Sequence, residues 1–357
     1  MRVAVCGGGV IGACIAWFLA RRGAEVVVIE RTGVACAASG KSGGFLALDW
    51  CDGTPLAPLA RRSFALHAEL AAMGFADWGY RRLETFSCVA SDRRRFAGRG
   101  GGPGWLGERA AVQGRLGGEA TTAQVHPARF TQGMMQAAIA AGAELRLDRV
   151  EDIVMHGGPG VVVDGETLAA DAVVVAMGPW TDLLRSSLRL PAVHGLKGNS
   201  VVLDTGGRAG AQALFVEMEL AGEVHTPEVF PRPDGTTYVC GLSGQQPLPE
   251  DPAAVTYDEG APETLRRMIR VFAPQLAEAP ILAQQACYRP VTRDGLPLIG
   301  AVAGMPGVYV ATGHSVWGIL NAPATGEVMA ALILDGRAGL ALAAFDPGRQ
   351  SPQAPKM

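Results

Sequence analysis

The segment that most constrains the fold of this chain is a glycine-rich run close to its N-terminus, Gly7-Gly8-Gly9-Val10-Ile11-Gly12. A short apolar strand, Val3–Cys6, precedes this run, and a helical pattern over Val10–Arg22 follows it and ends at Gly23. Glu25–Glu30 then has the composition of a second buried strand. Because strand–helix–strand crossovers are right-handed, the two strands should be parallel neighbours in one sheet.

Each glycine in this turn has its own physical task. Gly7 permits the tight turn, Gly9 lets the backbone approach a pyrophosphate, and Gly12 lets the helix pack closely against the strand. The free N–H groups at the start of the helix would then face the phosphates. Glu30, at the end of the second strand, could accept hydrogen bonds from an adenosine ribose, and its charge would repel a 2′-phosphate. The pattern predicts a dinucleotide site and leaves open FAD, NAD or a glycine-rich turn without a ligand.

The rest of the chain has the pattern of an α/β unit interrupted by short alternating strands. We expect helices over residues 58–73, 130–143 and 322–334, and strands over 145–150, 160–163, 172–176 and 308–310, of which 172–176 has the apolar pattern of a buried parallel strand. The glycine-rich residues 97–119 are expected to form a loop or an insertion, and residues 191–285 an antiparallel sheet. The predicted fold is a Rossmann-like domain (1–78, 124–190 and 286–345), an inserted antiparallel-sheet substrate domain (79–123 and 191–285) and a disordered tail (346–357).

Composition excludes several classes of function. Of the 357 residues, 48% are hydrophobic and 18% are charged, which is enough apolar material for a large core. The net charge of −3 gives no electrostatic footprint for nucleic acid or an anionic membrane. Seven widely spaced cysteines without a C-x-x-C pair argue against a disulfide framework and a zinc site. We therefore expect a cytoplasmic protein that binds neither metal, nucleic acid nor membrane, and the oligomeric state stays open.

Four later segments resemble the D-amino-acid oxidase, glycine oxidase and sarcosine oxidase superfamily. They are similar to a flavin-contact loop, a strand-end Ala-x-Gly-x-Trp, an Arg-Pro…Asp-Gly-x-Pro-x-Ile-Gly segment and a closing flavin loop with its helix: Ser39–Ala47, Val174–Trp180, Tyr288–Gly300, and Gly313–Gly318 with Ala322–Gly326. Gly43–Ala47 and Asp49–Gly53 are similar to one little-characterised branch of that superfamily.

The resemblance implies FAD as the cofactor and oxidation of the C–N bond of an amino acid or a secondary amine. In such enzymes hydride passes to flavin N5, the imine is hydrolysed, and O2 usually reoxidises the flavin to give H2O2, while the protein orients the reactants and excludes water. A dehydrogenase of the same fold would pass its electrons to a carrier instead. A non-catalytic flavoprotein subunit is a more remote alternative.

Together with the first motif, the resemblance implies a set of FAD-binding residues. These are Gly7, Gly9, Val10, Ile11, Gly12, Glu30 and Arg31; Ser39, Lys41, Ser42, Gly43, Gly44 and Phe45; Ala176, Gly178 and Trp180; and Cys287, Gly313, His314, Gly318 and Ile319. Ser39 and Ser42 would donate to phosphate or ribitol hydroxyls, and Lys41 would pair with the pyrophosphate. Cys287 stands where sarcosine oxidases attach FAD through a thioether. A buried cysteine can equally be mere packing, and we favour non-covalent FAD.

Arg289 is the main candidate for binding substrate. The matching arginine of glycine oxidase and D-amino-acid oxidase binds the substrate carboxylate, and a guanidinium can do so with two parallel hydrogen bonds. The alternative is a structural ion pair. Relatives often place a second basic residue in the loop where this chain has Ser315-Val316-Trp317, which leaves room for a larger or less acidic substrate.

Other residues are weaker candidates at the same site. His314 could lie at the pyrimidine edge of the flavin or near N5, and Trp317 and Tyr288 could wall the pocket or belong to the core. Lys41 and Lys197 are the lysines that could activate oxygen above the flavin. Glu228 and His225 could bind the amine of the substrate, or they could lie on an edge strand at the surface.

Overall fold

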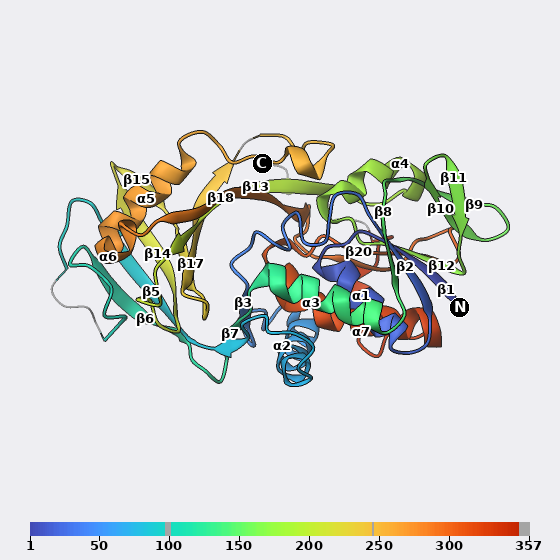
Figure 1. The fold of residues 1–357 in the computed structure, drawn as a ribbon, viewed down its shortest axis with the longest axis horizontal. Coiled ribbons are helices and arrows are strands. Elements are labelled where there is room, and N and C mark those ends of the chain that lie inside the picture. The colour runs from blue at the N-terminus through green and yellow to red at the C-terminus, as the bar shows by residue number, and fades with distance from the viewer. Residues whose placement is uncertain (97–100, 245, 350–357) are drawn as a thin grey trace.

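The computed structural model describes residues 1–96, 101–244 and 246–349. The glycine-rich unit folds as predicted into β1 (Arg2–Cys6), α1 (Val10–Ala20) and β2 (Glu25–Glu30), and β1 and β2 are parallel. β1 lies inside a six-stranded sheet with the order β19-β20-β12-β1-β2-β8 (Figure 1). The other strands of this sheet are β8 (Glu144–Leu147), β12 (Ala172–Val175), β19 (Leu298–Ala301) and β20 (Val308–Thr312). Only β19, at one edge, pairs antiparallel to its neighbour.

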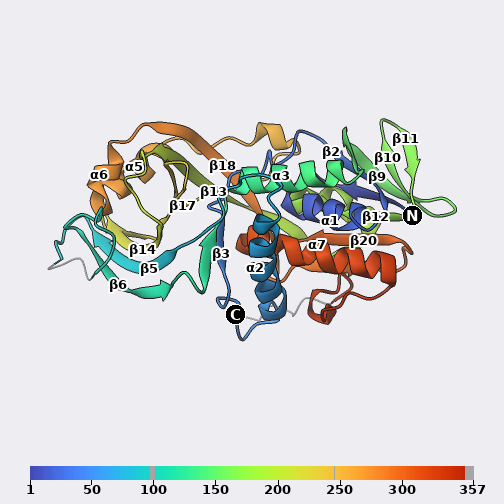
Figure 2. The same cartoon turned by 60° about the horizontal axis from the view of Figure 1, so that its bottom comes forward.

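Four helices share one hydrophobic core with a face of this sheet: α1, α2 (Ala57–Ala72), α3 (Pro127–Ala140) and α7 (Gly318–Asp335). Figure 2 shows α1, α3 and α7 stacked side by side and α2 crossing them. Since α3 and α7 both pack against it, α1 is buried along almost its whole length. The opposite face of the sheet packs against a small sheet of β9 (Val150–Met155), β10 (Pro159–Val163) and β11 (Glu166–Ala169).

One helical segment among the described residues, Ser315–Asp335, is long and apolar enough to cross a membrane. In the fold, 67% of its apolar window is buried. It packs against α1 and α2, which is the environment of a core helix.

A second, eight-stranded sheet forms the other end of the molecule (Figure 1). Its strand order is β18-β13-β17-β16-β14-β5-β6, with β15 paired to β14. The strands are β5 (Glu84–Ser91), β6 (Ala110–Gly117), β13 (Val193–Asp204), β14 (Gln212–Leu220), β15 (Glu223–His225), β16 (Glu228–Pro231), β17 (Thr236–Gly244) and β18 (Ile281–Thr292). Their apolar side chains form a core with α5 (Ala261–Phe272) and α6 (Pro274–Ala277).

A three-stranded sheet joins the two ends, with β7 (Thr122–Gln124) between β3 (Phe45–Ala47) and β4 (Arg81–Arg82). The remaining short elements are η1 (Gly178–Leu184), α4 (Arg185–Leu188), η2 (Pro252–Ala254), η3 (Ser315–Trp317) and η4 (Ala343–Phe345).

Several sequence expectations differ from the structure. The predicted loop 97–119 contains β6, an edge strand whose glycines and half-exposed side chains hide the usual apolar alternation. The predicted strand 145–150 is two strands, β8 and β9, separated at Asp148-Arg149. α5 and α6 were not predicted, and the second sheet contains one parallel pair, β14 with β5.

The predicted disordered tail is ordered at its start. Arg349 donates hydrogen bonds to Asp294 at 2.8 and 3.0 Å and to the carbonyls of Leu296 and Pro297. These contacts hold the segment Asp346–Arg349 against the body of the protein, and residues 350–357 of the tail lie outside the described residues. The division into two domains at the predicted residues stays a prediction.

Candidate cofactor and substrate site

A cavity of about 530 Å³ lies where the two large sheets meet. Residues at the carboxyl ends of β1, β2, β12 and β20 line one side of it, and residues of β13, β14, β16, β17 and β18 line the other. The carboxyl end of a parallel sheet is where open α/β folds bind their ligands. The cavity is therefore the natural place for the predicted dinucleotide.

The glycine-rich turn is shaped by close backbone contacts. Gly7 has φ +114°, and a Cβ atom on Gly12 would lie 2.0 Å from the Gly7 carbonyl oxygen. Only glycine lets α1 begin this close to β1, as the motif predicts. The N–H of Val10 donates to Ser39 Oγ at 2.9 Å, so the loop after β2 is fastened to the start of the helix.

Glu30 lines the cavity and also holds the turn together. Its Oε2 accepts a hydrogen bond from the N–H of Gly8 at 2.6 Å, and its Oε1 accepts from the N–H groups of Thr32 and Gly33 at 2.8 and 3.2 Å. This carboxylate is thus fixed at the end of β2, where the ribose of a bound adenosine is expected.

The loop that ends at Phe45 passes through a narrow gap between the two halves of the site. A Cβ atom on Gly43 would lie 2.3 Å from the Phe230 ring, and one on Gly44 would lie 2.0 Å from the Val125 carbonyl oxygen. Ser42 lines the cavity, and its buried Oγ has no hydrogen-bond partner in the described part of the chain. Lys41 is not among the lining residues.

Aromatic rings from both halves form an apolar wall. Phe45 stacks on Phe230 at 5.5 Å between ring centroids, and Trp50 lies 4.9 Å from Phe215. All four rings line the cavity, as does Trp180, whose Nε1 donates to the Pro249 carbonyl at 2.8 Å. A flat, largely apolar ring system such as an isoalloxazine suits such a wall.

The loop after β20 closes the cavity with His314, Trp317, Gly318 and Ile319. His314 is buried, its Nε2 lies 3.1 Å from Thr325 Oγ1, and its Nδ1 has no partner among the described residues. Burial lowers the pKa of His314 to about 3, so the imidazole is neutral near pH 7. Gly313 lies behind the lining, where a Cβ atom would meet Thr292 Cγ2 at 2.8 Å.

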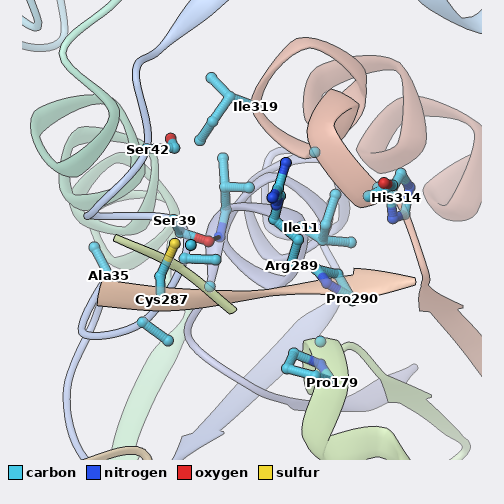
Figure 3. Close-up of a pocket in the computed structure, with 18 of the residues that line it drawn as sticks. Ile11, Ala35, Ser39, Ser42, Pro179, Cys287, Arg289, Pro290, His314 and Ile319 are labelled. Atoms are coloured by element: carbon cyan, nitrogen blue, oxygen red, sulfur yellow. Dashed lines mark hydrogen bonds between the residues drawn. The ribbon is translucent and has the colours of Figure 1, made fainter. Parts of the chain in front are cut away.

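β18 separates the candidates Cys287, Tyr288 and Arg289 by its alternation. Figure 3 shows Cys287 and Arg289 projecting from this strand in the same direction, and both line the cavity. Tyr288 lies on the other face, where its hydroxyl donates to the Gln246 and Pro247 carbonyls at 3.2 and 2.9 Å. Tyr288 therefore does not wall the pocket, because successive side chains of a strand point to opposite faces.

Neither candidate lysine reaches the cavity wall. Lys197 pairs with Tyr288 across β13 and β18 and lies on the same outer face. It is buried there, with its Nζ 2.6 Å from Asp258 Oδ1 and in contact with Gln246. Its charge is satisfied within the fold.

Glu228 and His225, which the sequence places together, lie in different surroundings. Glu228 lies on β16, between β14 and β17, and lines the cavity. Cys240 Sγ lies 3.7 Å from its Oε2, and burial raises the pKa of the carboxyl. His225 is on the short strand β15, 3.7 Å from Glu223, and does not line the cavity. His225 lies on a short strand beside β14 with 17% of its side chain exposed, and its role stays a prediction. The edge-strand interpretation is wrong for Glu228, because β16 is an inner strand.

A family model described as DAO, FAD dependent oxidoreductase, matches residues 2–332. The chain belongs to this family. It is 31% identical to the glycine oxidase of Geobacillus kaustophilus over 377 residues, which cover 96% of this chain and 95% of that protein. It is also 31% identical to a Schizosaccharomyces pombe protein named as an oxidoreductase, over 94% of each chain. The crystal structure of the Geobacillus kaustophilus glycine oxidase matches with a TM-score of 0.85 and 26% identity, covering 98% of this chain and 99% of that one.

FAD is therefore the cofactor of this DAO-family protein, and the cavity suits it. The N-terminal end of α1 with its positive dipole, the Glu30 carboxylate, the Ser42 hydroxyl and the aromatic wall offer partners for the phosphates, ribose, ribitol and ring system. We propose that FAD is held by the predicted residues that line the cavity: Gly7, Gly9, Val10, Ile11, Glu30, Arg31, Ser39, Ser42, Gly43, Gly44, Phe45, Ala176, Gly178, Trp180, Cys287, His314, Gly318 and Ile319.

Sequence reasoning missed other lining residues. Asp148, Arg149 and Val150 follow β8 and could have been found, since they come after the third parallel strand in the row β1-β2-β8. Phe215, Phe230 and Cys240 come from the second sheet, where the sequence has no motif that marks them.

Proposed function

We propose that this protein oxidises the C–N bond of an amino acid or an N-substituted amino acid, and that Arg289 binds the substrate carboxylate. The observation that carries this proposal is a guanidinium in the cavity without an acidic partner: within the described ranges, Arg289 has no carboxylate within 4.0 Å. Arg289 is half-buried at the cavity wall, and a guanidinium there without a counterion makes a substrate carboxylate its natural partner. Among the described residues, the nearest support for the alternative of a structural ion pair is Glu228, which interacts with Arg289 over more than 4.0 Å.

FAD supplies the redox chemistry of this reaction, because its ring accepts a hydride from the carbon beside the nitrogen. The chain itself supplies position and an apolar environment. The Arg289 fork would fix the carboxylate, and the rings of Phe45, Trp50, Phe215 and Phe230 would exclude water around the reacting carbon. Trp317, which also lines the cavity, would bound the substrate on the side of the closing loop.

We propose non-covalent binding of FAD and O2 as the acceptor of its electrons. The thiol of Cys287 is buried, and burial raises its pKa, which disfavours the thiolate that a thioether linkage needs. The name of the 31%-identical glycine oxidase supports the choice of O2. Acid precipitation should release the FAD into the supernatant, and turnover in air should produce peroxide. Colour that stays in the pellet would favour the Cys287 linkage, and substrate-dependent flavin reduction without peroxide would favour a dehydrogenase.

The substrate test is anaerobic bleaching of the flavin by a panel of N-methyl, D-, L- and cyclic amino acids, because bleaching does not depend on the final acceptor. For a substrate found this way, Arg289→Met should lower kcat/KM by about 10²–10³-fold, the usual effect of removing one partner of a buried charge pair. The exposed Arg293, four residues along the chain, gives the matched control Arg293→Met. Equal kinetics in the two variants would remove Arg289 from the site.

A further inference from the structure

Glu228 lines the same cavity as Arg289. The proposed function gives its carboxyl group no role. Phe215 of β14 pairs directly with it in the sheet, and on the other side Cys240 of β17 does so. Both neighbours also line the cavity. Glu228 thus stands in the floor of the substrate side of the site, formed by the second sheet.

Among the described residues, no positively charged group contacts the carboxyl group of Glu228. In the part of the chain that the structure describes, its one side-chain hydrogen-bond partner is the thiol of Cys240, and no basic group lies within 4.0 Å. Phe215 offers no polar group, and Arg289 on β18 interacts with Glu228 only over a longer distance. The cavity therefore holds one cation and one anion that face it without being paired to each other.

The other two acids that line the cavity are occupied. Glu30 accepts three backbone hydrogen bonds, one from Gly8 in the glycine-rich turn and two from Thr32 and Gly33 after β2. Asp148 is bonded to the side chain of Arg146 at 2.9 Å and to the N–H of Arg149 at 2.8 Å. Among the described residues, Glu228 is therefore the acid lining the cavity whose carboxylate accepts no hydrogen bond from a charged group or from a backbone N–H.

A separated guanidinium and carboxylate in one apolar cavity are complementary to a zwitterion. The carboxylate of an amino acid suits Arg289, and its ammonium group suits an acid on the opposite wall. We propose that Glu228 binds the amino group of the substrate in its cationic form and so selects zwitterionic amino acids over simple carboxylates. This inference rests on the proposed role of Arg289.

Two redox-inert probes of equal shape test it. Betaine, (CH3)3N⁺–CH2–COO⁻, and 3,3-dimethylbutyrate, (CH3)3C–CH2–COO⁻, differ only in the positive charge. Each is titrated into the FAD-loaded protein, and binding is followed by the change in flavin absorbance. The proteins are the wild type, Glu228→Gln and the control Glu217→Gln, which changes an exposed glutamate on the neighbouring strand β14.

The wild type should bind betaine more tightly than 3,3-dimethylbutyrate. Glu228→Gln should weaken betaine and strengthen 3,3-dimethylbutyrate, so that the ratio of the two dissociation constants changes by about tenfold to hundredfold. Glu217→Gln should leave the ratio unchanged. Because both probes are measured on one preparation, a loosened site would shift both constants in the same direction.

The pH dependence gives a second readout. In the wild type, betaine binding should weaken as the pH falls and Glu228 takes up a proton, whereas 3,3-dimethylbutyrate binding should not weaken over that range. Burial raises the pKa of Glu228, which places this change above the range of an ordinary glutamate. The betaine dependence should disappear in Glu228→Gln.

The proposal is overturned if Glu228→Gln leaves the ratio unchanged, if both probes shift alike, or if the wild type binds neither probe. Failure of the Arg289 proposal has a different signature. In that case Arg289→Met would bind 3,3-dimethylbutyrate as well as the wild type does, while the Glu228→Gln effect on betaine could still be present.

Discussion

At this site some residues matter because they lack a side chain, as the glycines do, and others matter because of the charged group they carry. Gly12 was predictable because its task is local: any chain that packs a helix onto β1 through this turn needs it. Arg289 was predictable from its motif. The sequence could not show that Tyr288 lies on the opposite face of the strand from Arg289, because residues 281–292 carry too little polar–apolar alternation. Glu228 has no sequence signal, since its position depends on which strands lie beside β16.

Gly12→Ala tests the closest of these contacts. The added methyl group would lie 2.0 Å from the Gly7 carbonyl oxygen, so α1 must move away from β1. We expect a loss of about 1–3 kcal/mol in the free energy of unfolding, the usual cost of overpacking, and weaker retention of FAD. Urea unfolding and the ratio of flavin to protein absorbance measure both. Gly114→Ala on β6 is the control, because no atom lies within 4 Å of the added methyl group. Two variants that behave alike would contradict the packing argument.

At the scale of elements, the unit β1–α1–β2 of the first sheet was predicted correctly because its parts are close together in the sequence. β1, α1 and β2 follow one another in the sequence and carry their own turn chemistry. α7 was predicted from Ala322 but begins at Gly318. Its first turn contains two residues that line the cavity, Gly318 and Ile319, and is held from outside by the buried His67 of α2. His67 Nε2 lies 2.9 Å from the Ile319 carbonyl oxygen and 3.2 Å from that of Leu320.

The contact between α2 and α7 should make the protein sensitive to acid. Burial lowers the pKa of His67 to about 4, below the value of about 6.5 for an unfolded histidine. The unfolded chain therefore binds more protons between these values. The stability that neutral His67 contributes is complete above pH 6.5 and is lost as the pH falls toward 4. At pH 5 the loss should be about 2 kcal/mol from this residue.

Urea unfolding of His67→Gln at pH 7 and pH 5 measures this contribution. Glutamine can still donate to the Ile319 carbonyl but does not titrate, so the variant should lose less stability than the wild type between the two pH values. His156→Gln, at an exposed position, should behave like the wild type. An equal pH dependence in all three proteins would mean that His67 does not carry the effect.

At the scale of the whole molecule, the cavity depends on two sheets that have separate cores. Periodicity and motifs predicted β1, β2, β12 and β20 of the first sheet, but not β19. The prediction placed residues 79–123 and 191–285 in one domain, but it did not give β5 and β6 as strands or say that β5 pairs with β14, because pairing over such separations leaves no local pattern. The aromatic wall and Glu228 follow from that pairing, which is why the substrate side of the site was the part that sequence reasoning described least.

Since residues of both sheets line the cavity, the bound cofactor should stabilise the molecule as a unit. At a free FAD concentration about 1,000-fold above its dissociation constant, the expected gain is about 4 kcal/mol. Thermal melts of dialysed protein at increasing FAD concentration should show a rising Tm, and the same concentrations of NAD should leave it unchanged. A rise with NAD equal to that with FAD would contradict the assignment of the cavity to a flavin.

The central position of β1 in its sheet affects how the protein folds during its synthesis. β1 precedes the other strands of its sheet along the chain, yet its neighbour β12 ends at Val175, and β20, on the far side of β12, ends only at Thr312. Such a high contact order slows folding and leaves apolar strand edges open to other chains meanwhile. On the ribosome β1 can pair with β12 only after residue 175 has been made, and β20 can join the sheet only after residue 312. Cofactor loading should therefore follow the synthesis of β20, and before that point the nascent chain should be a client of chaperones.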